Sequence, residues 1–220
     1  MSLEIIHLRK LLKIFYLSPS KRMSALRNDI REDIAKGEGA TGGGDFYGPF
    51  WRDAKDHVFG RSDLHERIAI RIENNPRRER LYPLLRDGFL LWWNDRRRWQ
   101  NEPFEPAAWL KGSVSFDDIG GKVKIDNILA VRDGQEVDHY IYPYFSVEPS
   151  LNEEAARLGI WLLIRGLPDV NPEEIRILDV IRGTTYSVDR NPLNGDEGAI
   201  FRAKYKSALL EWRKLWAEYE

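Results

Sequence analysis

Apolar residues recur at helical spacing through most of the first hundred residues. The pattern predicts helices over residues 3–17 and 19–36, a short helix that ends at Gly60, and helices over residues 63–74 and 77–100. The last of these has the strongest pattern and we expect it to pack centrally. Its apolar stripe consists of Leu81, Leu84, Leu85, Phe89, Trp92 and Trp99.

After residue 101 the period changes from helical to alternating. Residues 109–116, 122–131 and 137–147 are rich in β-branched and aromatic side chains and are separated by turn signals, so three consecutive antiparallel strands are expected. A buried helix capped by Ser150 follows. Residues 174–181 and 185–189 then predict a strand and a return strand, and residues 196–219 predict a final amphipathic helix.

This order predicts a single α+β domain. A helical region, residues 1–100, packs on a core, residues 101–220, that contains a mixed sheet of four or five strands, the buried helix and the C-terminal helix. The glycine-rich segment 37–44 is the best candidate for a loop. It lacks the preceding strand and the Gly-Lys-Ser/Thr ending of a phosphate-binding P-loop.

Composition excludes several classes of protein. The chain has no cysteine, which removes disulfides, thiolate metal sites and a cysteine nucleophile. A mean hydropathy of −0.52 and the lack of a long apolar run argue against a membrane protein. The N-terminal residues lack a cleavage-site pattern, so a cytoplasmic location is the expectation.

Charge is distributed unevenly along the chain. Residues 1–111 carry 21 Lys and Arg against 16 Asp and Glu, a net charge of +5, whereas residues 112–220 carry 13 against 19, a net charge of −6. This asymmetry is compatible with a basic face for a polyanion, and equally with an ordinary solvated surface.

One aspartate carries a resemblance to a known family. The segment GKVKIDNILAV places Asp126 in the second predicted strand, after a short apolar run. Together with the αβββαβ order over residues 77–190, this resembles the core of the PD-(D/E)xK nuclease-like superfamily, which includes RecB-like nucleases and restriction endonucleases. The resemblance implies a restriction endonuclease-like fold, in which the aspartate binds Mg²⁺ or Mn²⁺ and an acidic-x-Lys pair on the next strand completes the site.

The third strand departs from that pattern. It has no acidic residue followed two positions later by lysine, and Tyr142 or Tyr144 stands where the lysine is expected. The catalytic site is therefore either lost or rebuilt. In a rebuilt site, Asp126 and Lys124 act with a second metal ligand drawn from Glu136, Asp138 and Glu148. The alternative is that Asp126 only forms an ion pair with Lys124 or an arginine.

Two further groups of residues suggest binding surfaces. Arg78, Arg96, Arg97 and Arg98 lie along the helix predicted over residues 77–100, with Trp93 as its exposed ring; arginine and aromatic side chains together hold phosphates and stack on bases. The alternative is a solvated helix face. Tyr140, Tyr142 and Tyr144 share one face of a strand, which forms either a ligand or partner surface or a layer beneath a helix.

Three functional hypotheses follow. The first is a protein with a nuclease-like fold and no intact catalytic motif, which binds nucleic acid or a protein partner. No cofactor is predicted with certainty for it. The second is an active Mg²⁺- or Mn²⁺-dependent nuclease that uses Asp126. The third is a structural protein in which the tyrosine strand and the terminal amphipathic helices form a homodimer. No membrane partner is expected.

Overall fold

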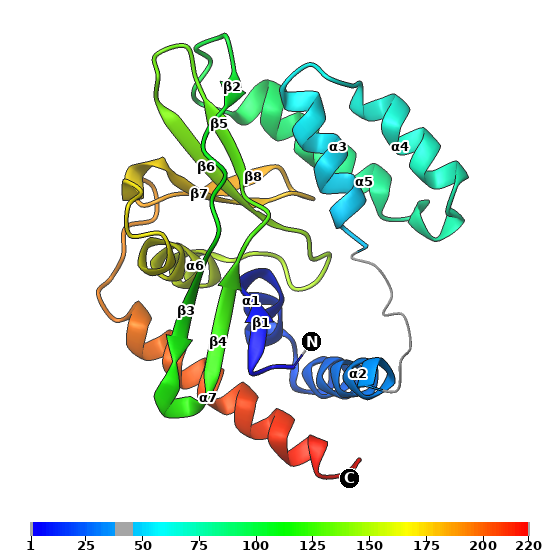
Figure 1. The fold of residues 1–220 in the computed structure, drawn as a ribbon, viewed down its shortest axis with the longest axis vertical. Coiled ribbons are helices and arrows are strands. Elements are labelled where there is room, and N and C mark those ends of the chain that lie inside the picture. The colour runs from blue at the N-terminus through cyan, green and yellow to red at the C-terminus, as the bar shows by residue number, and fades with distance from the viewer. Residues whose placement is uncertain (1, 38–45, 220) are drawn as a thin grey trace.

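The structure, a computed structural model, describes residues 2–37 and 46–219 (Figure 1). Its helices are α1 (Leu8–Tyr16), α2 (Pro19–Gly37), α3 (Gly48–Val58), α4 (Leu64–Glu73), α5 (Tyr82–Leu91), α6 (Glu153–Gly166) and α7 (Glu197–Trp216). Its strands are β1 (Ile5–His7), β2 (Glu105–Pro106), β3 (Gly112–Phe116), β4 (Gly121–Ile125), β5 (Leu129–Arg132), β6 (Asp138–Tyr144), β7 (Ile175–Asp179) and β8 (Thr184–Tyr186). Short 3₁₀ turns occupy Pro76–Arg78, Asp117–Ile119 and Pro172–Glu174, and a π-helical segment spans Trp92–Arg96.

The strands form two sheets rather than one. A five-stranded sheet has the order β2-β5-β6-β7-β8, with β6 and β7 parallel and its other pairs antiparallel. A three-stranded sheet has the order β1-β4-β3, in which β1 runs parallel to β4. The mixed α+β class is confirmed, and the larger sheet has the expected number of strands.

The second predicted strand is bent in the middle. Residues 122–131 separate into β4 and β5, because the chain leaves the strand conformation at residues 126–128. Asn127 has a φ of 61°, in the left-handed region that asparagine tolerates better than most residues. The two sheets therefore share one bent stretch of chain, with Asp126 at the bend.

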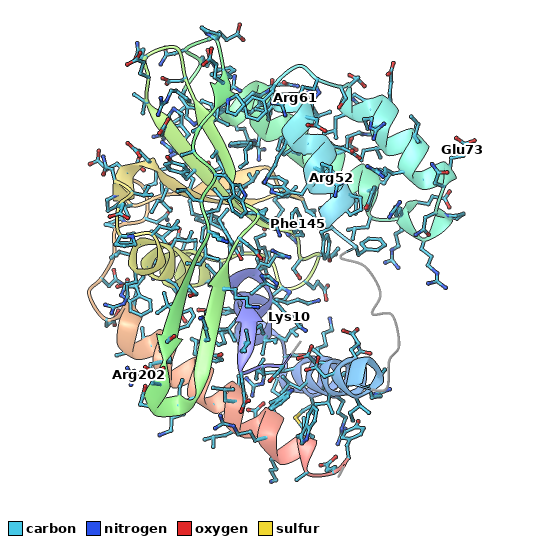
Figure 2. All side chains as sticks on the ribbon, in the orientation of Figure 1. Lys10, Arg52, Arg61, Glu73, Phe145 and Arg202 are labelled. Atoms are coloured by element: carbon cyan, nitrogen blue, oxygen red, sulfur yellow. The ribbon has the colours of Figure 1, made fainter. Side chains whose placement is uncertain are left out.

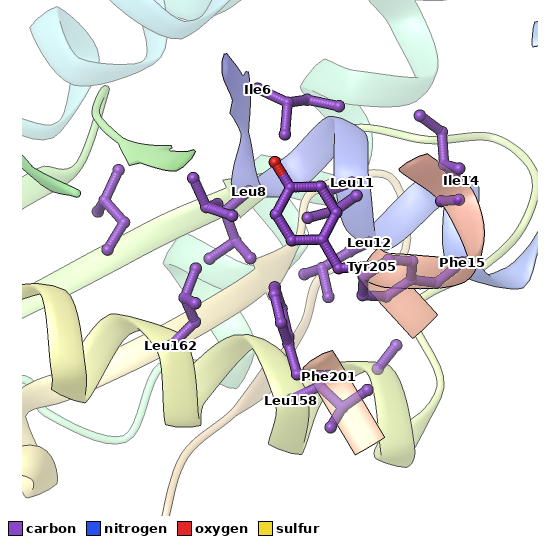
Figure 3. Close-up of a cluster of buried hydrophobic side chains, with 14 of the residues drawn as sticks. Ile6, Leu8, Leu11, Leu12, Ile14, Phe15, Leu158, Leu162, Phe201 and Tyr205 are labelled. Carbon is purple, nitrogen blue, oxygen red and sulfur yellow. The ribbon is translucent and has the colours of Figure 1, made fainter. Parts of the chain in front are cut away.

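Hydrophobic side chains form two cores, one on each face of the five-stranded sheet. The first contains α1, α2, α6 and α7, and Figure 3 shows residues of α1 facing Leu158 and Leu162 of α6 and Phe201 of α7. The second contains α3, α4 and α5 (Figure 1). The expected helical region 1–100 thus packs in two parts, since α1 and α2 join the C-terminal helices and α3–α5 lie on the opposite face.

Some predicted elements are corrected by the structure. Residues 5–7 form β1 rather than the first turn of a helix, with Ile6 buried and Ile5 exposed. The run 77–100 is a 3₁₀ turn, α5 and a π-helical segment, and Leu84 on its predicted stripe is 46% exposed. Asn152, not Ser150, caps α6, because its side chain accepts the Ala155 N–H at 2.8 Å. Apart from Gly37, the predicted loop 37–44 lies outside the described residues.

In the described ranges, no helix is both long and apolar enough to cross a bilayer.

Helix α5 approaches the turn between β7 and β8 closely enough to need a glycine. A Cβ at Gly88 would lie 2.2 Å from the carbonyl oxygens of Val180 and Ile181, well inside van der Waals contact. Both neighbours are backbone atoms, so no rotamer change relieves the overlap. This contact fixes the distance between the second core's central helix and the sheet.

Gly88→Ala is therefore expected to lower the free energy of unfolding by roughly 1–3 kcal/mol or more, because helix and turn must separate. Urea denaturation followed by tryptophan fluorescence measures the change. Gly37→Ala is the matched control, since a Cβ there meets no atom of the described residues within 4 Å and alanine favours helix. Equal losses in both variants would contradict the close-packing explanation.

Candidate functional site: the strand bend and an arginine pocket

Asp126 lies between groups from three separate elements. The Nδ1 atom of His7 at the end of β1 lies 3.0 Å from its Oδ2, and Arg9 Nη1 of α1 lies 3.2 Å from its Oδ1. The Asn127 side-chain amide also donates to Oδ1, at 3.3 Å. Both carboxylate oxygens are therefore engaged by groups that donate hydrogen bonds or carry positive charge.

These contacts decide the ionisation of Asp126. Burial alone would raise its pKa, but the hydrogen bond to His7 and the charges of His7 and Arg9 outweigh that effect and lower the pKa below its ordinary value. Asp126 is thus a stable anion at neutral pH. Asp126 does form an ion pair, and Arg9 is the arginine.

The second side of the bend is held by helix α3. Trp51 Nε1 donates to the Asn127 carbonyl, and Lys55 Nζ donates to the Ile128 carbonyl at 2.7 Å. Burial lowers the pKa of the Lys55 amine to about 8, against the opposing charge of Asp126. The backbone carbonyls exposed by the bend are therefore satisfied from the second core.

The remaining predicted metal ligands are dispersed. Asp138 forms a two-point ion pair with Arg132, at 2.7 and 3.0 Å, at the end of β6 away from the bend, about 13 Å along the strand from Ile128. Glu148 pairs with Lys21 on the surface, and Glu136 lies in the turn before β6. Lys124 lies on β4, opposite His7 and Ser113 in register.

A hard divalent cation is a poor fit to this arrangement. It needs several oxygen ligands, and no group of three His, Cys, Asp or Glu side chains that could hold a metal occurs in residues 2–37 and 46–219. Asp126 already contacts Arg9, and Asp138 already contacts Arg132. The residues proposed for Mg²⁺ or Mn²⁺ do not form a ligand set.

The tyrosines of β6 belong to the first core rather than to a surface. Tyr140, Tyr142 and Tyr144 are 6%, 1% and 2% exposed, respectively. The Tyr142 hydroxyl accepts the Arg9 backbone N–H at 3.0 Å, and the Tyr144 hydroxyl donates to the Pro149 carbonyl at 2.8 Å. The ligand-surface prediction is wrong because the sheet is covered by helices on this face, whereas the predicted alternation is confirmed.

The predicted arginine surface is also rearranged. Trp93 is 8% exposed, not an exposed ring, and the Arg97 guanidinium stacks 3.6 Å from its centroid. Arg78 stacks on Tyr82 at the other end of the helical run, away from Arg97. Arg96 Nη1 donates to the Arg182 carbonyl at 2.9 Å and so attaches this segment to the β7–β8 turn.

Arg97 and Arg98 meet two arginines from distant sequence. Just after the π-helical segment, they line a small pocket with Arg176 of β7 and Arg190 of the chain after β8. Figure 2 draws the side chains as sticks on the ribbon and labels Phe145, a second-core residue just after β6. The pocket joins the helical segment to the edge of the sheet.

Trp99 forms a rigid wall of this pocket. Its ring stacks on His139 of β6 with centroids 4.0 Å apart and a 7° angle between the planes. His139 Nε2 lies 3.2 Å from Asp133 Oδ2. Burial opposes ionisation of Asp133, but hydrogen bonds from His139 and the Val137 N–H lower its pKa to about 2. Trp99 therefore packs against a buried histidine that itself contacts the buried Asp133 carboxylate.

Sequence reasoning missed Arg176, Arg190, Arg9 and Lys55. Arg176 did carry a signal, because it stands between Ile175 and Ile177 in an apolar strand. Arginine is rarely buried without a partner, so its position there indicates a specific contact. Arg190, Arg9 and Lys55 become significant only through contacts across the fold.

Compared with family models, curated proteins and solved structures, the chain matches none of them.

Asp126→Asn is expected to lower the free energy of unfolding by about 1–2 kcal/mol at pH 7, since His7 and Arg9 lose their carboxylate partner. Because the pKa of Asp126 is lower in the folded state, its stabilisation is complete above the ordinary pKa near 4 and is lost as pH falls through the lowered value. Urea unfolding at pH 7 and pH 3 should show the smaller difference between wild type and variant at pH 3.

Glu148→Gln serves as the control for this experiment, because its ion pair with Lys21 is exposed and should contribute no measurable stability. An Asp126→Asn protein as stable as wild type at pH 7 would contradict the role given to the bend contacts.

Proposed function

We propose that this protein binds nucleic acid without cleaving it, on a restriction endonuclease-like fold. What supports the fold assignment is the order of α5, β3, the bent β4–β5 stretch, β6, α6 and then β7 parallel to β6, with β3 antiparallel to β4, β5 antiparallel to β6 and Asp126 at the bend. The absence of cleavage is supported by the contacts of Asp126, which holds Arg9 and His7 where a nuclease would hold a metal.

The observation that carries the binding function is the convergence of arginines at one pocket. Arg97 and Arg98 directly follow the π-helical segment, and Arg176 and Arg190 lie about 80–90 positions later in the sequence. Arginine is the residue best suited to phosphate, since its planar guanidinium donates two parallel hydrogen bonds. Trp92 and Trp99 supply aromatic surface at the same place.

The other two hypotheses have weaker support. For a metal-dependent nuclease, the part of the chain that the structure describes offers no ligand set around Asp126. The homodimer was predicted from the tyrosine strand and the terminal amphipathic helices. Those tyrosines are buried, and α1 and α7 bury most of their apolar residues in the first core, although Leu210 of α7 is 57% exposed. The described part of the structure adds no supporting residue to either hypothesis.

Fluorescence anisotropy with labelled single- and double-stranded DNA and RNA over a range of KCl concentrations tests the binding. We expect Kd to rise with salt, and the double variant Arg97→Gln/Arg98→Gln to reduce the slope of log K against log salt by roughly one per lost phosphate contact. The double variant Arg77→Gln/Arg80→Gln is the charge-matched control, because both arginines are exposed in the stretch before α5 and lie outside the pocket.

Absence of binding to all four nucleic acids would overturn the proposed function. The same samples incubated with Mg²⁺ or Mn²⁺ test the lack of cleavage: we expect intact strands. Cutting that disappears in Asp126→Asn would instead establish a nuclease.

A further inference from the structure

The arginine pocket has an unusual balance of charge. Four arginines line it, and Asp189 is the one carboxylate among its lining residues. That carboxylate already accepts a hydrogen bond from the Ser187 hydroxyl and lies 3.8 Å from Arg98 at the exposed rim. Like charges held close together in a partly desolvated site repel one another, so an anion bound among them would stabilise the folded protein.

Arg97 is placed to bind such an anion. Its guanidinium lies against the rings of Trp93, Trp99 and Phe104, with centroid distances of 3.6, 4.9 and 4.4 Å. Among the described residues, its Nε and Nη1 atoms have no hydrogen-bond partner although both are buried. Burial lowers the pKa of Arg97 to about 10, which leaves the group positively charged at neutral pH. Buried donors without acceptors are costly unless a ligand satisfies them.

Arg176 reaches the pocket from the sheet. It lies on the β7 face opposite Ile175 and Ile177, and its Nη1 donates to the Glu174 carbonyl at 3.0 Å. Burial lowers its pKa as well. Thr185 of the neighbouring strand β8 adds a hydroxyl to the lining. The sheet and the helical segment therefore each supply a guanidinium, and these two elements are held together by the Arg96 contact described above.

The size of the pocket limits what enters it. Its volume is about 30 Å³, whereas a single water needs roughly 10–15 Å³ by the same kind of measure, so a group of a few atoms fits and a nucleobase does not. A terminal phosphate has one substituent, three free oxygens and a charge of about −1.5 to −2 at neutral pH. An internal phosphodiester has two bulky substituents and a single charge, which suits this pocket less well.

We propose that the pocket between the Trp92–Arg96 segment and strands β7 and β8 binds the terminal phosphate of a nucleic-acid strand, with Arg97 and Arg176 as its principal donors. This inference rests on the proposed nucleic-acid binding and adds recognition of strand ends to it. Trp92 and Trp99 lie beside the phosphate position and limit its approach.

The test compares oligonucleotides of one sequence that carry a 5′-phosphate, a 3′-phosphate or only hydroxyl ends, with the dye placed at the opposite end or on an internal base. Anisotropy at fixed salt is expected to show tenfold or greater tightening for one phosphorylated end, the gain typical of charge-assisted hydrogen bonds. The preference should shrink between pH 7.5 and pH 5.5, because the monoester takes up a proton with a pKa near 6 whereas arginine stays charged.

Variants connect that preference to the pocket. Arg176→Gln is expected to bring the affinities of the phosphorylated and unphosphorylated strands within about twofold of each other, while binding of the unphosphorylated strand persists. Arg97→Lys keeps the charge but loses the planar fork, so it should reduce the preference by a similar factor. Arg80→Gln should retain it in full. Matching near-ultraviolet circular dichroism and urea midpoints establish that each variant is folded, and either pocket variant alone is sufficient for the test.

The outcomes separate the two proposals. Salt-dependent binding with equal affinity for phosphorylated and hydroxyl ends would overturn terminal-phosphate recognition and leave nucleic-acid binding standing. An end preference unchanged in both Arg176→Gln and Arg97→Lys would also overturn it. A third outcome is that no oligonucleotide binds, whereas inorganic phosphate or a nucleoside monophosphate does. The pocket is then a site for small phosphates, and both proposals fail.

Discussion

The bend between β4 and β5 is the feature on which the rest of the structure depends. A single stretch of chain serves both sheets, and at residues 126–128 it gives up the regular strand hydrogen bonds that would otherwise satisfy its backbone. The Asn127 and Ile128 carbonyls instead accept side-chain donors from outside the strand. Arg9 and His7 hold the Asp126 side chain from the first core, and Trp51 and Lys55 hold the following carbonyls from the second.

This arrangement ties the two cores to one another. The first core contains α1, whose start is coupled to Asp126, and the second contains α3, whose side chains reach residues 127 and 128. A local change at the bend therefore acts on helices from both faces of the sheet. It also explains why the Asp126 side chain can stay ionised while about two-thirds buried. Its contacts supply hydrogen bonds and positive charge that stabilise the carboxylate in place of the water lost on burial.

Periodicity predicted the local structure better than the contacts. The alternation of β6 correctly divided Tyr140, Tyr142 and Tyr144 from Ile141 and Phe145, because a strand's side-chain period is fixed by its backbone. It did not reveal that helices cover both faces. That depends on where distant segments pack, so the sequence left open whether the tyrosine face is a ligand or partner surface or a layer beneath a helix, and its burial in the first core matches the second alternative. Trp93 was misplaced for a different reason: in a π-helical segment, successive residues do not follow the spacing of an α-helix.

The candidate site shows a similar limit and a useful exception. Arg97 and Arg98 were predicted from sequence as phosphate contacts, but their partners Arg176 and Arg190 lie beyond the reach of any local pattern. Arg176 is the exception in principle, since an arginine inside an apolar strand has to be explained by a partner. Within residues 2–37 and 46–219, the hydrogen-bond acceptor of Arg176 is the Glu174 backbone carbonyl rather than a carboxylate. The burial of Arg176 next to Arg97 concentrates positive charge at one place on a protein whose net charge is −1. Such local concentration, rather than total charge, governs the attraction of an anion at physiological salt, because screening removes the contribution of charges more than about 8 Å away. The acidic C-terminal half is therefore compatible with a phosphate site built partly from its own strands.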